Sequence, residues 1–194
     1  MLLLVVALIV PALGVRPGFH STGSLEWRDC GVGDSWVSVK QFDIQPSPIK
    51  LPGDMTVSLD GTISHDISDQ VTLDVVMEKK LLGRFVKVPC QGSLGSTSLL
   101  LRFISVGICH YTDPCHFLNT FKQQGTCPPQ LTANGLPCTC PFSPNKLHLP
   151  PSKFTVTNAW RFLIDGELHI KITMDDKHTK QLRGCFETYL NIDV

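Results

Sequence analysis

The sequence lacks an excess of charge of either sign, and it lacks any apolar run long enough to cross a membrane as a helix. Lysine plus arginine and aspartate plus glutamate number 17 each, so the chain has no fixed basic field for nucleic acid. The apolar run at the start, MLLLVVALIVPAL, ends at residue 13, short of the ~18 residues that a membrane-spanning helix needs. The balance of charge therefore excludes an electrostatic nucleic-acid binder, and no membrane-spanning helix is predicted.

Catalytic motifs are missing as well. The chain contains no Gly-x-Ser-x-Gly elbow, no His-Glu-x-x-His helix and no phosphate-binding loop. Carboxylates such as Glu78 and Glu187 fall on the polar faces of alternating segments, where contact with solvent accounts for them. We therefore expect a protein that is not an enzyme, with no catalytic residue and no cofactor.

The short apolar run at the start has the character of a cleaved secretory signal. Ala12-Leu13-Gly14 offers a small-residue cleavage site, so the predicted signal covers residues 1–14, with cleavage possible as late as about residue 22. The run departs from the usual pattern because no lysine or arginine precedes it. The remaining chain is long enough for one domain with a sizeable core, and we place that domain at residues 24–194.

The eight cysteines are concentrated in one proline-rich stretch. Five of them lie between Cys109 and Cys140, among prolines that cannot donate to a helix or sheet. An even number of cysteines in a secreted chain predicts four disulfides, although 105 pairings remain open. A Cys/His metal site with His110 and His116 is the alternative. It is disfavoured because the one close pair, Cys138-Thr139-Cys140, lacks Cys-x-x-Cys spacing, and we expect no metal.

Several segments alternate between apolar and polar residues, as strands with one buried face do. One short helix is expected at Cys115–Phe121, with Asp113 as its N-cap and Pro114 at its first position. Turns separate the strands at Pro52-Gly53-Asp54 and Asp175–His178. The pattern predicts an all-β sandwich or cup, with strands in Trp36–Ile44, Met55–Ile63, Val71–Met77, Val86–Val88, Leu168–Met174 and Leu182–Ile192.

Two apolar tips do not fit a simple sandwich. The hairpin at Lys79–Arg84 carries Leu81 and Leu82, and residues 159–164 (AWRFLI) precede a turn. Apolar tips beside basic residues are typical of proteins that touch membranes, although such residues can also fold over the core. The seven histidines would make the chain cationic in an acidic compartment and favour anionic lipid surfaces, unless they are incidental surface residues.

Longer stretches of sequence carry a resemblance to a known family. They are IQPSPIKLPGDMTVSL (44–59), VMEKKLLGRFVKVPC (76–90), GLPCTCPF (135–142), LPPSKF (149–154) and LRGC (182–185). With these motifs the chain resembles the ganglioside activators of the ML-type lipid-recognition domain family over nearly its whole mature length. The resemblance implies an open sandwich of two antiparallel sheets that encloses an apolar lipid cavity. It also implies four disulfides: Cys30–Cys185, Cys90–Cys109, Cys115–Cys140 and Cys127–Cys138.

The resemblance further implies a function. Such a protein extracts a ganglioside or related glycosphingolipid from membranes and presents it to lysosomal β-hexosaminidase A. It would touch the anionic lysosomal membrane transiently, and it would be found in the lysosome and also secreted. Two alternatives remain: a secreted lipid carrier or innate-immunity lipid-recognition protein that activates no hexosaminidase, and a disulfide-stapled domain whose core is filled.

The resemblance also indicates which residues would contact lipid. The expected rim residues are Leu81, Leu82, Phe85, Trp160, Phe162 and Leu163. The expected cavity lining is Val57, Leu59, Leu73, Val75, Met77, Ile170 and Ile172.

Three features depart from the family. Phe85 stands where tryptophan is common, Asp54 replaces the asparagine of a glycosylation sequon, and residues 91–104 form an insert. The insert has three interpretations: an error in the gene model or in splicing, a tolerated surface loop, or an added lipid-contacting element.

Overall fold

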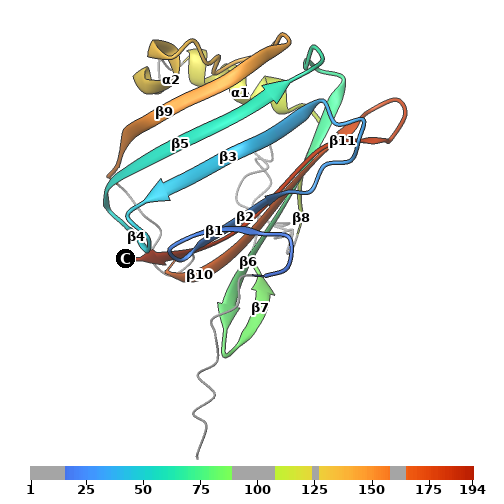
Figure 1. The fold of residues 1–194 in the computed structure, drawn as a ribbon. Coiled ribbons are helices and arrows are strands. Elements are labelled where there is room, and N and C mark those ends of the chain that lie inside the picture. Colours follow the sequence, from blue (N-terminus) through green and yellow to red (C-terminus); the bar gives the residue numbers. More distant parts are fainter. Residues whose placement is uncertain (1–15, 89–107, 124–126, 158–164) are drawn as a thin grey trace, which may run out of the picture.

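The computed structural model describes residues 16–88, 108–123, 127–157 and 165–194. In these residues the chain forms two β-sheets and two short helices (Figure 1). The strands of the larger sheet, sheet A, are β1 (His20–Thr22), β2 (Leu25–Asp29), β4 (Ile49–Lys50), β6 (Val71–Leu81), β7 (Arg84–Lys87), β8 (Ile108–Tyr111), β10 (Gly166–Asp176) and β11 (Leu182–Asp193).

Sheet A follows the order β1–β2–β11–β10–β6–β7, with antiparallel neighbours throughout. β8 pairs antiparallel with β6, and the short β4 pairs parallel with β11. Sheet B contains β3 (Val37–Gln45), β5 (Gly53–Ile63) and β9 (Asn145–Val156) in that order, again antiparallel. The expected all-β architecture of two antiparallel sheets is therefore confirmed.

The six strands expected from alternation all form. Most extend further than the pattern suggested: β6 continues to Leu81, and β10 continues through Asp176, so the turn expected at Asp175–His178 begins later. The hairpin between β6 and β7 closes with Leu82 and Gly83, both at positive φ, which is the conformation of a two-residue hairpin turn that matches strand twist.

β9 is not among the strands expected from the sequence, and it contains Pro150 and Pro151. It lies at the edge of sheet B, and the two prolines fall where its register with β5 shifts, between the pairs Val57–Ser152 and Leu59–Leu149. At a bulge on an edge strand, a residue without an N–H group removes no hydrogen bond between the paired strands. The prolines are therefore compatible with the strand.

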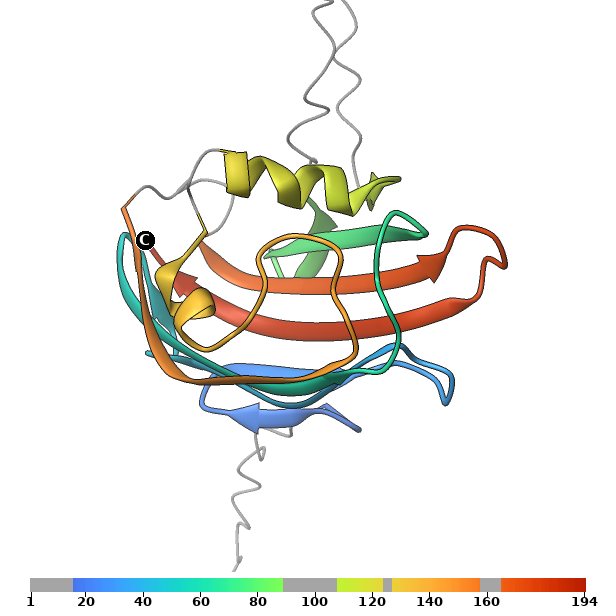
Figure 2. The ribbon, with the colours of Figure 1, turned by 90° about the horizontal axis from the view of Figure 1, so that it is seen from above.

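Both helices lie in the cysteine-rich stretch. α1 (Pro114–Gln123) confirms the expected helix, and the Asp113 carboxylate accepts a hydrogen bond of 2.8 Å from the backbone N–H of His116, as an N-cap does. α2 (Pro129–Ala133) is a single turn. Figure 2 shows α1 on the β6 side and α2 on the β9 side, in agreement with their contacts. Neither of these two described helices is long and apolar enough to span a bilayer.

The core between the sheets has two centres. One surrounds Trp27, whose ring lies 6.4 Å from that of Phe42 and 6.2 Å from that of Phe186. The other surrounds Val71 and Met174 at the opposite end of the sandwich. Within sheet B, Gly61 on β5 has no room for a side chain, because a Cβ there would lie 2.6 Å from the carbonyl oxygen of Ser38 on the neighbouring strand β3.

Three of the expected disulfides are present in the described residues, namely Cys30–Cys185, Cys115–Cys140 and Cys127–Cys138. Cys109 is also disulfide-bonded, but Cys90, its expected partner, lies outside the described residues. So do the predicted signal at residues 1–14, the insert at 91–104, and the second apolar tip with Trp160, Phe162 and Leu163.

Candidate functional site

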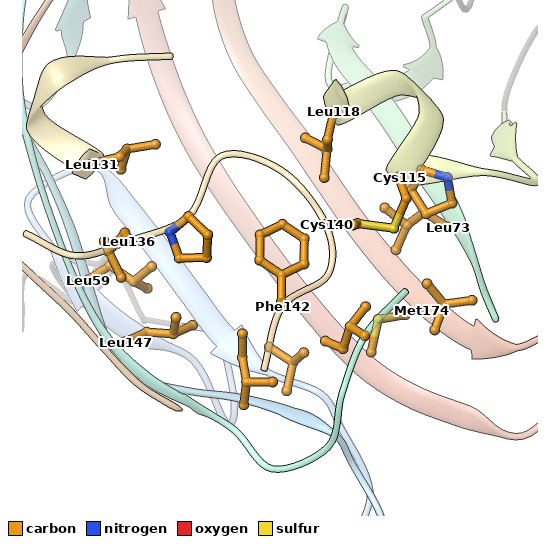
Figure 3. Close-up of a pocket in the computed structure, with 16 residues that line it drawn as sticks. Leu59, Leu73, Cys115, Leu118, Leu131, Leu136, Cys140, Phe142, Leu147 and Met174 are labelled. Carbon is orange, nitrogen blue, oxygen red and sulfur yellow. A yellow bond between two sulfur atoms is a disulfide. The ribbon is translucent and has the colours of Figure 1, made fainter. Parts of the chain in front are cut away.

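An apolar pocket of about 300 Å³ lies between the two sheets and the helical segment. Its walls come from β3, β5 and β9 on one side, from β6 and β10 on the other, and from both helices (Figure 3). Among the residues that the structure describes, every lining residue is apolar or a cysteine held in a disulfide, and none of them is a nucleophile, acid or base. The lining residues are Val37, Leu59, Ile63, Ile67, Val71, Leu73, Pro114, Cys115, Leu118, Leu131, Leu136, Pro137, Cys140, Phe142, Leu147 and Met174.

The covalent crosslinks hold the helical wall of this pocket in place. The Cys115–Cys140 disulfide joins the first turn of α1 to the segment that carries Phe142, and Figure 3 shows this bond at the pocket wall. Phe142 is held from the other side by two backbone hydrogen bonds of 2.9 Å with Ile67. The segment therefore keeps its position without a regular strand or helix.

α2 is attached to the opposite wall. The Gln130 side-chain amide donates a 2.5 Å hydrogen bond to the carbonyl of Lys153 on β9, and the Cys127–Cys138 disulfide closes the loop around the helix. These contacts bring Leu131 into the pocket, facing Leu59 and Leu147 (Figure 3).

Two of the seven predicted lining residues, Leu59 and Leu73, line this pocket. Val57 and Ile170 instead pack against the core around Trp27. The other three, Val75, Met77 and Ile172, are half-buried and share a face of sheet A with Leu73, because Ile172 pairs with Val75 and Ile170 pairs with Met77. This shared face forms an apolar stripe beside the pocket.

The β6–β7 hairpin presents exposed apolar side chains. Leu82 is fully exposed at the turn, while Leu81 and Val86 are 49% and 48% exposed. Leu81 lies on the same face of β6 as Leu73 and Met77, but Lys79 lies between Met77 and Leu81 on that face, where it pairs with Val86. The apolar stripe therefore ends at Met77, and Leu81 forms a separate apolar contact point at the hairpin tip. Four basic residues lie on the hairpin: Lys79, Lys80, Arg84 and Lys87.

Phe85 is not brought together with the two leucines. It pairs with Lys80 and therefore faces the outer side of sheet A, where its ring centroid lies 5.9 Å from that of His169 and 5.6 Å from that of Tyr189. Alternation in a strand separates Phe85 from Leu81 even though the two are close in sequence. Phe85 anchors the hairpin to the body of the sheet.

His169 is the centre of a polar cluster on this outer face. Its Nδ1 lies 2.8 Å from a Glu78 oxygen, and its Nε2 lies 2.8 Å from a Glu187 oxygen. The other Glu187 oxygen accepts two hydrogen bonds from Arg28, at 2.8 and 2.5 Å. Burial opposes ionisation of Glu187, but the hydrogen bonds from Arg28 and His169 hold its pKa below its ordinary value. The cluster ties β2, β6, β10 and β11 together. The expectation that Glu187 contacts solvent was therefore wrong, because this carboxylate is buried among Arg28 and His169.

Sequence reasoning missed most of the pocket wall. Leu118, Leu131, Leu136 and Phe142 come from the proline- and cysteine-rich stretch, which has no strand or helix periodicity to mark an inward face. The one signal in the sequence was that Leu118, Leu136 and Phe142 each lie within three residues of a disulfide cysteine. In the described part of the chain, no group of three or more histidine, cysteine or acidic residues could hold a metal ion.

Comparisons with known proteins agree with this architecture. Residues 24–192 match the ML domain family. The chain is 34% identical to a ganglioside GM2 activator of Mus musculus over 155 residues, which cover 79% of this chain and 74% of the relative. It is 33% identical to a ganglioside GM2 activator of Macaca fascicularis over 170 residues, which cover 85% and 81% of the two chains.

A third similarity is shorter. The chain is 34% identical to a phosphatidylglycerol/phosphatidylinositol transfer protein of Mycosarcoma maydis over 58 residues, or 29% of this chain and 30% of the relative.

Proposed function

The chain belongs to the ML domain family, and we propose that it is a non-enzymatic lipid-binding activator. In this proposal it extracts a ganglioside or related glycosphingolipid from a membrane and presents the head group to β-hexosaminidase A. Its similarity to two ganglioside GM2 activators over most of its length supports the lipid class and the activator role. The protein itself makes and breaks no bond.

The observation that carries the proposal is the apolar pocket. Each methylene group moved from water to an apolar site contributes about 0.8 kcal/mol, so a lipid with two chains rarely leaves a bilayer unaided. A pocket without a polar side chain in its wall offers those methylenes an environment close to the bilayer interior. Transfer between membrane and protein then becomes nearly neutral in free energy.

The apolar stripe on sheet A supplies a path for the lipid. It leads from Leu73 and Met174 in the pocket wall, past Val75 and Ile172, to Met77. Between Met77 and Leu81 at the hairpin tip, the same face carries Lys79, which pairs with Val86. A lipid chain that passes Val86 and the alkyl part of Lys79 stays in contact with hydrocarbon between the membrane and the pocket. We therefore place the membrane-facing end of the protein at the β6–β7 hairpin.

The same hairpin has the charge that an anionic membrane attracts. Leu81 and Leu82 are flanked by Lys79, Lys80 and Arg84, although Lys80 is paired with Glu167 at 2.6 Å. Each basic residue near an anionic surface contributes ~1 kcal/mol of attraction. We propose transient contact with the anionic lysosomal membrane, with the protein located in the lysosome and also secreted.

The experiment measures ganglioside transfer between vesicles and activation of β-hexosaminidase A in parallel. Purified full-length protein is mixed at pH 5 with vesicles that contain a fluorescent ganglioside and with unlabelled acceptor vesicles. We expect transfer to the acceptor vesicles and faster cleavage of the ganglioside by β-hexosaminidase A. An absence of ganglioside transfer would refute the proposed lipid function, and transfer without faster cleavage would refute the activator role.

A carrier of other lipids is the second candidate. The short similarity to a phosphatidylglycerol/phosphatidylinositol transfer protein favours it, and the apolar pocket does not distinguish one pair of acyl chains from another. Labelled phosphatidylglycerol in the same vesicle assay decides between the two. Efficient phospholipid transfer, with neither ganglioside transfer nor hexosaminidase stimulation, would establish the carrier.

A further inference from the structure

A second cavity, of about 400 Å³, opens on the outer face of sheet A where β6 begins and β10 ends. Side chains alternate along both strands, so this cavity lies back to back with the apolar pocket: Leu73 and Met174 face the pocket, while Thr72 and Asp175 face the cavity. All of its lining side chains are polar, in contrast to those of the pocket. They are Thr72, Asp74, His110, Thr112, Asp175, Lys177 and Lys180.

The charges of this lining restrict the ligand. Lys177 and Lys180 carry positive charge, Asp74 and Asp175 carry negative charge, and His110 adds one positive charge when it is protonated. The balance is therefore neutral or one positive, which suits a ligand with a single negative charge. A phosphate dianion would meet two carboxylates and only a small excess of positive charge. The two threonine hydroxyls and the carboxylates can bind hydroxyl groups as donors and acceptors.

The turn that carries both lysines is held by its own hydrogen bonds. A side-chain oxygen of Asp176, a buried residue, accepts hydrogen bonds from the backbone N–H groups of His178 at 2.7 Å and Thr179 at 3.0 Å. These bonds lower the pKa of Asp176, and the Asp176 carbonyl accepts a third bond from the Lys180 N–H at 2.9 Å. The turn therefore projects its side chains from a fixed backbone.

The side chains of the opposite wall, on β6 and β8, are also held in position before a ligand binds. Nδ1 of His110 lies 2.5 Å from Oδ1 of Asp74 across the β8–β6 pair, so the imidazole is oriented before any ligand arrives. The backbone N–H of Lys177 bonds to the Gln70 carbonyl at 2.8 Å. The cavity walls thus need little reordering on binding, which lowers the entropy cost of binding.

We propose that this cavity binds a sugar that carries one carboxylate. The ammonium groups of Lys177, which also donates a hydrogen bond to the carbonyl of Asp69, and Lys180 hold the carboxylate, while the threonines and the Asp74–His110 pair hold the hydroxyl groups. The inference rests on the proposed function, because the sialic acid of a ganglioside head group is one source of such a sugar. A free acidic glycan is the other source.

The first experiment tests the site itself. The full chain is titrated with 3′-sialyllactose by isothermal calorimetry, with lactose as the uncharged control. Lys180→Gln removes one cation from the cavity, and Lys146→Gln is the matched control on β9, on the other sheet. We expect sialyllactose to bind more tightly than lactose, and Lys180→Gln to weaken this binding roughly tenfold, as the loss of a charge-assisted hydrogen bond does. Equal binding of the two sugars, or equal effects of the two variants, would overturn the inference.

The second experiment separates the two sources. Transfer of a ganglioside is compared with transfer of its asialo counterpart for the original protein and for Lys180→Gln. A preference for the ganglioside that Lys180→Gln removes identifies the head group as the source. Sialyllactose binding without such a preference identifies the free glycan. Ganglioside transfer without any sialyllactose binding overturns this inference alone, whereas sialyllactose binding without ganglioside transfer overturns only the proposed function.

Discussion

The double change Leu81→Asp and Leu82→Asp tests whether the β6–β7 hairpin contacts membranes. Both side chains are exposed, at 49% and 105%, so their replacement removes little packing from the folded protein. Leu82 has φ of 49°, a conformation that aspartate tolerates better than leucine does. We therefore expect the free energy of unfolding to stay within about 0.5 kcal/mol of its original value.

The effect on membrane binding is much larger. Complete burial of a leucine side chain contributes roughly 1.5–3 kcal/mol. With Leu81 counted at half its area because it is already half-buried, the two leucines lose ~3 kcal/mol. This corresponds to roughly a hundredfold weaker partitioning, and two new carboxylates beside an anionic surface add to the loss.

Flotation with anionic vesicles at pH 5 measures this partitioning, while thermal unfolding checks the fold. Val32→Asp is the matched control, because Val32 is 56% exposed and lies in the loop between β2 and β3. That loop is at the opposite end of sheet A, near the start of β11. If the double variant binds vesicles like the original protein, or if Val32→Asp binds as weakly as the double variant, the hairpin is not the membrane contact.

Three further predictions concern the pocket and the fold. Leu118→Trp should fill the pocket and reduce ganglioside transfer, at a cost of ~1–3 kcal/mol from overpacking; unchanged transfer would show that lipid binds elsewhere. Gly61→Ala should lower the melting temperature, because its Cβ would meet the backbone carbonyl of Ser38 at 2.6 Å; an unchanged melting temperature would contradict this packing. Since the pKa of Glu187 is lowered, its stabilisation is present above its unfolded pKa of about 4.3 and is lost as pH falls through the lower folded value. Glu187→Gln should therefore destabilise the protein by roughly 2 kcal/mol at pH 7 and less at pH 3, and equal losses at both pH values would exclude this linkage.

Strands with one buried face could be predicted directly from the sequence. In β5, β6 and β10 the alternation of apolar and polar residues is local, and it records which face each strand buries. The same holds for the start of α1, where Asp113 and Pro114 act within a single turn. β9 was missed because two prolines interrupt its pattern, and only its place at the edge of sheet B makes them acceptable.

The binding site depended on contacts that no local pattern records. Val57 and Leu59 belong to the same alternating face of one strand, yet Val57 packs into the core and Leu59 lines the pocket. The difference arises from the facing elements: the core around Trp27 lies against Val57, whereas Leu59 faces the pocket wall that contains Leu131. Likewise, Phe85 follows the exposed hairpin in sequence, but strand pairing turns it to the outer face against His169 and Tyr189.

The sequence by itself determined the six strands with clear alternation, the start of α1, the absence of catalytic motifs and the resemblance to a lipid-recognition family, because these depend on local order and composition. Only the tertiary structure decided how the sheets and the disulfide-bonded segment enclose a pocket. Leu118 on α1, Leu147 on β9 and Met174 on β10 meet there from distant parts of the chain. It also showed that Thr72 and Leu73, adjacent in sequence, open onto a polar cavity and an apolar pocket on opposite faces of one sheet.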